Sequence, residues 1–115
     1  MESGHALPST RGRISIAGRA VVQIAGHTVA ECYGVVGMDG GRVSRLRARE
    51  TRGVEVRGTP RGLEITLHVV VEYGLNLAEV AASVSNRVAY EVARLTGLPV
   101  RAVEVHVDDV RTGRK

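Results

Sequence analysis

The chain has 115 residues, of which 43% are apolar, and this suits one domain with one hydrophobic core. Its formal net charge of +4 raises the question of a nucleic-acid or anionic-membrane partner. A single cysteine excludes an internal disulfide and a cysteine-based zinc site, and the apolar runs are far too short to span a bilayer.

The first part of the chain predicts a tail, a strand, a helix and a second strand. Residues 1–11 contain Gly, Ser and Pro but no apolar stretch, so we expect a flexible tail and not a signal peptide. Residues 13–16 alternate as a short strand does. Apolar side chains in residues 18–32 form one stripe of an amphipathic helix. Gly34 suits the cap that ends this helix, and residues 35–38 read as a strand.

An arginine-rich segment follows. Residues 39–53 contain five arginines and two acids, a net charge of +3. The segment predicts either a single helical turn, held by Val43 and Leu46, or a loop. Its arginines are Arg42, Arg45, Arg47, Arg49 and Arg52.

The second part of the chain predicts a hairpin, a long helix and a last strand. Residues 54–57 and 63–73 alternate between apolar and polar side chains around a Gly- and Pro-rich turn, which is typical of an antiparallel hairpin. Asn76 can cap a helix that Gly97 ends, and residues 101–110 alternate again. The expected core positions are Leu63, Ile65, Leu67, Val69, Val71 and Tyr73 on the strand and Val80, Val84, Val88, Val92 and Leu95 on the helix.

These elements predict an α+β fold. We expect a two-layer sandwich in which two helices pack on one face of a mixed or mainly antiparallel sheet of four to five strands, in the order β-α-β-β-β-α-β. Residues 12–110 should form the single domain, followed by a short basic tail at residues 111–115.

Seven short motifs, in order along this domain, resemble those of the bacterial alkaline shock protein family. They are GRISIAGRAVVQIAG (12–26), ECYGVVGM (31–38), GVEV (53–56), VVVEYG (69–74), NLAEV (76–80), TGLPV (96–100) and VEVHV (103–107). No single motif is specific, and the resemblance rests on their order and spacing. Gly18 at the start of the first helix and the arginine-rich segment depart from the family pattern.

The resemblance implies a cytoplasmic, non-enzymatic protein linked to cell-envelope stress. Members of this family gather at the inner face of the membrane through a small membrane-anchored partner, and some self-assemble. We therefore expect a membrane-anchored protein partner and a homo-oligomer. The resemblance implies no catalytic residue and no cofactor.

The residues themselves offer little chemistry. Cys32 lies on the predicted apolar stripe, so we interpret it as a core residue and not as a nucleophile. His68 and His106 are expected on the sheet face opposite the core, and with a carboxylate they could bind a metal if their strands are neighbours. We favour a polar face that is solvated or covered by a partner. Its proposed contact residues are Glu64, Thr66, His68, Val70, Glu72 and His106.

The arginine-rich segment leaves three interpretations open. It is a solvated loop, a contact for an acidic protein or lipid surface, or a phosphate-binding surface of a small RNA-binding module. The last is the alternative function, and it is the less favoured one because the segment contains no aromatic residue on which bases would stack.

Overall fold

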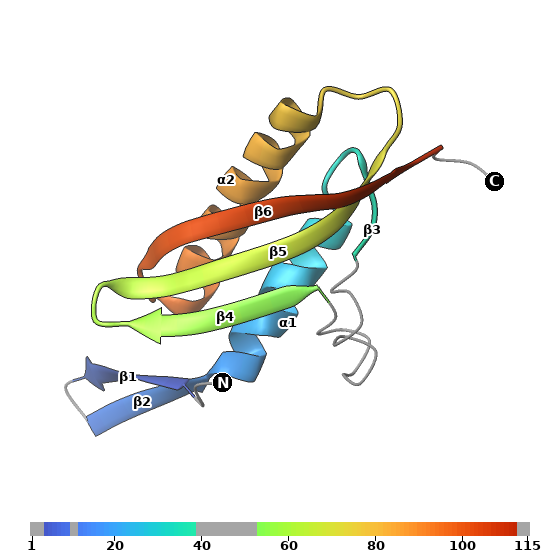
Figure 1. The fold of residues 1–115 in the computed structure, drawn as a ribbon. Coiled ribbons are helices and arrows are strands. Elements are labelled where there is room, and N and C mark those ends of the chain that lie inside the picture. Colours follow the sequence, from blue (N-terminus) through green and yellow to red (C-terminus); the bar gives the residue numbers. More distant parts are fainter. Residues whose placement is uncertain (1–3, 10–11, 39–52, 113–115) are drawn as a thin grey trace.

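The computed structural model describes residues 4–9, 12–38 and 53–112. Two helices lie on one face of a twisted sheet, as Figure 1 shows. In chain order the elements are β1 (Gly4–Ser9), β2 (Gly12–Ala17), α1 (Gly18–Ala30), β3 (Val35–Met38), β4 (Val54–Thr59), β5 (Gly62–Glu72), α2 (Leu77–Thr96) and β6 (Val100–Arg111). The predicted α+β class and the arrangement of two helices on one sheet face are confirmed.

The long strand β5 is the centre of a four-stranded mixed sheet. β4 pairs with its first part in antiparallel fashion, and β3 pairs with its last part, also antiparallel. β6 runs parallel to β5 along the whole of its other edge, from the pair Leu63–Val100 to the pair Glu72–Arg111. The parallel pairing follows from the connection, because α2 carries the chain back to the starting end of β5.

β1 and β2 form a separate two-stranded antiparallel sheet. Residues 4–9 belong to the segment expected to be a tail, and the structure places them in a hairpin strand. Among the described residues β1 pairs only with β2, and its sequence shows no apolar alternation from which a strand could be predicted. The strand expected at residues 13–16 is present as β2, but it lies outside the main sheet.

The helix α1 follows β2 without a side-chain cap, since Ala17 occupies the N-cap position. Its apolar stripe buries Val21, Val22, Ala25 and Val29. The helix ends at Ala30, and its C-cap is Glu31 in a right-handed conformation, so the expectation that Gly34 caps it is wrong. Gly34 has a positive φ of 90° in the turn that follows. The left-handed glycine thus serves the turn into β3 and not the cap of the helix.

The helix α2 has the predicted capping residues at both ends. The Asn76 side chain accepts a hydrogen bond of 3.0 Å from the Glu79 backbone amide, and Gly97 has a left-handed φ of 76°. Val80, Val84, Val88 and Val92 are buried as expected.

The core is built almost entirely from valine, with the leucines and isoleucine of β5. Leu63, Ile65 and Leu67 each have 1% or less of their surface accessible. Two expected core positions are wrong: Tyr73 is 72% exposed and Leu95 is 55% exposed. Tyr73 lies just past the end of β5, where alternation no longer applies, and Leu95 lies one residue from Thr96, whose side chain takes the buried position. No helix in the described part of the chain is long and apolar enough to cross a membrane.

Candidate functional site

The helix-free face of the sheet carries most of the charged side chains that the structure brings together, and we call it the outer face. Side chains on a strand alternate between the two sheet faces, so the residues between the buried ones point away from the helices. The accessible outer-face residues of the three long strands are Glu55 and Arg57 of β4, Glu64, Thr66 and His68 of β5, and Glu104, His106 and Asp108 of β6.

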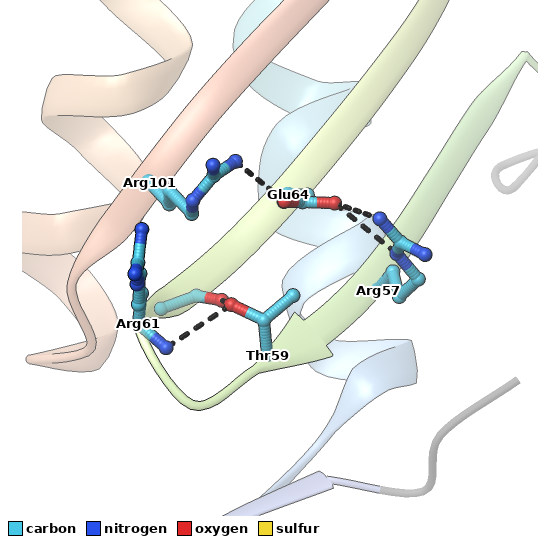
Figure 2. Close-up of polar contacts among 6 residues, drawn as sticks. Arg57, Thr59, Arg61, Glu64 and Arg101 are labelled. Atoms are coloured by element: carbon cyan, nitrogen blue, oxygen red, sulfur yellow. Dashed lines mark hydrogen bonds and ion pairs between the residues drawn. The ribbon is translucent and has the colours of Figure 1, made fainter.

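Glu64 links three strands at one end of this face. Its carboxylate accepts hydrogen bonds from Arg57 of β4, including one of 3.1 Å from Nε, and one of 2.6 Å from Nη1 of Arg101 of β6. Figure 2 shows Glu64 between the two guanidinium groups. The hydrogen bond from Arg57 is the main cause that lowers the pKa of Glu64, and it raises the pKa of Arg57.

The β4–β5 turn lies beside this network. Thr59 Oγ1 donates to the Gly62 carbonyl at 2.7 Å and accepts from the Arg61 backbone amide at 3.1 Å, as drawn in Figure 2. These bonds fix the turn, and they place the exposed Arg61 near the same end of the face as Arg101. This end is therefore rich in arginine, with one carboxylate at its centre.

His68 and His106 form a stacked pair in the middle of the outer face. Their ring centroids are 4.9 Å apart and their planes differ by 17°. His68 Nδ1 lies 3.0 Å from Asp108 Oδ2, and His106 Nε2 lies 3.5 Å from Glu104 Oε1. The parallel register that pairs residue 68 with residue 106 produces this contact. The expectation that the two imidazoles approach each other if their strands are neighbours is confirmed.

Within residues 4–9, 12–38 and 53–112, no group of three or more His, Cys, Asp or Glu side chains could hold a metal ion. Each imidazole instead has its own carboxylate, and the two rings are stacked. This arrangement orders the four side chains as a polar surface.

The remaining predicted contact residues differ in their accessibility. Thr66 is half-buried and lies between Glu55 and Glu104 on the neighbouring strands. Glu72 is half-buried near the end of β5. Val70 is only 1% accessible, so it contributes nothing to the exposed surface. The predicted contact arginines Arg42, Arg45, Arg47, Arg49 and Arg52 lie outside the described residues.

Cys32 is buried, as its place on the apolar stripe predicts. Its thiol is 3.4 Å from the Thr28 carbonyl oxygen, and burial raises its pKa. A buried thiol with a raised pKa is a poor nucleophile. The structure therefore gives this residue a packing role.

Sequence reasoning missed an open groove between the two helices. Ile24 and His27 of α1 and Arg87, Glu91 and Leu95 of α2 are among its lining residues. Arg87 Nη2 of α2 lies 3.9 Å from Oε1 of Glu31, the residue that follows α1, so an ion pair joins the two sides of the groove. Leu95 was assigned to the core stripe because a helical pattern alone does not distinguish a core from a groove between neighbouring helices.

Comparison with protein families gives one match that covers most of the chain. Residues 6–112 match the family of alkaline shock protein 23, which is described by a cell envelope-related function.

Similar curated proteins come from Gram-positive bacteria. The protein YloU of Bacillus subtilis is 34% identical over 107 residues, which cover 87% of this chain and 89% of that protein. YqhY of the same organism is 28% identical over 109 residues, covering 90% of this chain and 81% of that protein. A stress response regulator gls24 homolog of Streptococcus pyogenes is 27% identical and covers 89% of this chain, but only 60% of that protein is matched.

The fold also occurs in solved structures with little sequence similarity. A MamM CTD variant superimposes with a TM-score of 0.51 at 14% identity, over 80% of this chain and 94% of that one. A second MamM CTD variant, in a zinc form, gives 0.50 at 13% identity, over 85% and 87% of the two chains. At such identities the likeness concerns the fold alone.

Proposed function

The chain belongs to the alkaline shock protein 23 family, and from that premise we propose that it is a non-enzymatic binding protein of the cell-envelope stress response. It acts in the cytoplasm, at the inner face of the membrane, by binding a membrane-anchored protein. The outer face of the sheet is the docking surface.

The observation that carries this proposal is the ordered charge pattern of the outer face. Glu64 holds two arginines from the neighbouring strands, and the stacked histidines each lie against a carboxylate. Side chains that are already held in place lose less conformational entropy when a partner binds.

The charges also indicate what the partner segment should look like. Glu55, Glu104 and Asp108 give the middle of the face an acidic character, whereas Arg57, Arg61 and Arg101 surround one carboxylate at the hairpin end. A complementary segment carries basic residues opposite the middle and an acidic residue opposite the hairpin end, because opposite charges fix register across an interface.

The test is capture of membrane proteins from the native host with the full-length tagged chain, after solubilisation of the membranes. The informative variant is Thr66→Arg, which places a long side chain at the centre of the outer face between two glutamates that can pair with it. The control is Asn86→Arg, a substitution of an exposed residue on α2. We expect wild type and the control to recover the same membrane protein, and Thr66→Arg to lose it.

Two results would contradict the proposal. If Thr66→Arg and the control recover the membrane protein equally, the docking surface does not lie on the outer face. Recovery of RNA and ribosomal proteins, abolished by RNase, with no membrane protein in any sample, would favour the RNA-binding alternative.

A further inference from the structure

The outer edge of β6 is the longest open strand edge in the described part of the molecule. β6 has twelve residues and pairs with β5 on one side. On its other side no strand among the described residues pairs with it, and Figure 1 shows it as the border of the sheet. An open strand edge of this length offers a row of backbone donors and acceptors to another strand.

The side chains of β6 are incompletely covered on the helix side as well. Val103, Val105 and Val107 pack against the core, but each stays half-buried. By contrast, the residues of β5 that pair with these three valines are completely buried. A further strand beside β6 would complete the cover of these three valines.

The sequence of β6 is complementary to itself in one antiparallel register. With Val105 on a two-fold axis, Val103 lies opposite Val107 of the second copy on the helix side. On the outer face, Glu104 lies opposite His106, and this pair occurs twice by symmetry. Beyond the regular part, the same register brings Arg101 opposite Asp109. Opposite charges at facing positions stabilise an antiparallel pair.

Neighbouring registers lose this match. A shift that places residue 104 on the axis puts two glutamates directly opposite each other. A shift that places residue 106 on the axis puts Glu104 opposite Asp108. Like charges at facing positions destabilise a strand pair, so the charges of β6 disfavour these two registers relative to the one centred on Val105.

The flank of α2 that lies over β6 leaves room for a second copy. The Ser85 hydroxyl is 3.5 Å from the Val103 carbonyl oxygen, which places this side of the helix above β6. Ala81 and Ala89, four residues before and after Ser85, lie on the same flank and are half-buried. Across the two-fold axis the two α2 helices would face each other with small side chains, which allow close approach.

From the open edge, the half-buried valines and the charge pattern we propose that β6 pairs with β6 of a second copy of this chain. The pairing is antiparallel, is centred on Val105, and joins two four-stranded sheets into one of eight strands. It involves Glu104 and His106 of the outer face, but its backbone contacts lie at the strand edge, and both outer faces stay exposed on the same side of the joined sheet.

A charge-swap experiment on the full chain tests the register. The dimer dissociation constant is measured by sedimentation at low ionic strength and mildly acidic pH, where histidine carries charge. His106→Glu and Glu104→Lys each replace two opposite-charge contacts by like-charge ones, and each should raise the dissociation constant about tenfold. The double variant restores opposite charges within and between chains, and should bind as wild type does.

The control for this experiment is Glu55→Lys, on β4 at the other side of the sheet, which should leave the constant unchanged. A wild-type chain that stays monomeric at every concentration overturns the proposal. So does a dimer that ignores both single substitutions, or one that the double substitution fails to restore.

A cysteine on the two-fold axis gives an independent readout. Facing residues of an antiparallel pair have Cα atoms within the range that a disulfide spans. Val105→Cys should therefore form a disulfide-linked dimer on mild oxidation, while the native Cys32 is buried and does not compete. Val36→Cys, at a 43% exposed position on β3, should remain monomeric. Equal cross-linking of both variants would overturn the axis at Val105.

Discussion

Glu64 makes protein stability depend on pH in a defined direction. Its pKa in the folded chain is lowered from the ordinary 4.5, mainly by the hydrogen bond from Arg57. A carboxyl group whose folded pKa is below its unfolded pKa stabilises the fold above the unfolded value, and this contribution is lost as the pH falls through the folded value. The relevant window therefore lies below pH 4.5.

We predict that Glu64→Gln is less stable than wild type at neutral pH, and that the difference shrinks as the pH falls below that value. Urea unfolding followed by circular dichroism at a series of pH values measures it. Glu55→Gln is the matched control, because Glu55 lies on the same face but makes no ion pair within the described residues. A difference between wild type and Glu64→Gln that grows toward low pH would contradict the assignment.

Cys32 should be protected from thiol reagents. It is 7% exposed and its pKa is raised by burial, so both access and thiolate formation are reduced. We predict slow reaction with a chromogenic disulfide in the native chain and fast reaction in urea. Equal rates in both states would show that the α1 end opens readily.

At the residue scale, the alternation of the sequence predicted which face of the sheet a side chain lies on. It did not predict how deeply that side chain is buried, because burial depends on the packing of other elements. The contact between His68 and His106 could be predicted only if their strands were assumed to be neighbours. Alternation determines the sheet face of a residue but not the order of the strands. Val70 occupies an outer-face position in the pattern, yet it is buried. The alternation of β5 carries no information on what covers either face.

Two glycines that follow helices, Gly34 in the turn after α1 and Gly97 at the C-cap of α2, differ in what surrounds them, and this difference gives a paired test at the element scale. Gly34 and Gly97 both have positive φ, at 90° and 76°. A Cβ on Gly34 would lie 2.9 Å from Leu75 Cδ1, whereas a Cβ on Gly97 would meet no atom within 4 Å. Only the first position therefore adds a steric clash to the backbone strain.

We predict that Gly97→Ala lowers the free energy of unfolding by about 1 kcal/mol, which is the backbone term alone. Gly34→Ala should lower it by about 2 kcal/mol or more, because Leu75 must also move. Chemical denaturation of the two variants side by side measures the difference. Equal losses would show that the chain relaxes around Gly34 without cost.

The elements with strong periodicity and caps were predictable, and the pairing of strands was only partly so. The α2 helix was delimited by Asn76 and Gly97 because a side-chain cap and a left-handed glycine are local signals. The strand β1 was missed because nothing in residues 4–9 repeats with the period of a buried strand. The open edge of β6 was also not predictable, since an edge is a property of the whole sheet and not of one strand.

The whole molecule should open in stages. β5 is bonded on both edges and buried between its neighbours and the helices, whereas β1 and β2 form a two-stranded sheet of their own. Two-stranded sheets are marginally stable in water, so this hairpin should open at low cost. Hydrogen exchange followed by mass spectrometry should therefore show β5 as the slowest strand and β1–β2 as the fastest.

Slow exchange of β1–β2 in the monomer, equal to that of β5, would contradict this ranking. The measurement also separates the two proposals made above. Pairing between copies should add protection to the β6 amides as the protein concentration rises. Binding of the docking partner to the outer face should change amide exchange in β5 only when that partner is present.

The order of the strands has a consequence for biosynthesis. The partners of β5 on one edge, β3 and β4, precede it in the chain, but its partner on the other edge, β6, follows it after a whole helix. Until β6 has been synthesised, the nascent chain holds β5 and the valine stripe of α2 without the strand that packs beside them. The four-stranded sheet can therefore close only after β6 leaves the ribosome, and a chain truncated before Val100 would expose apolar surface that favours aggregation and removal by chaperones and proteases.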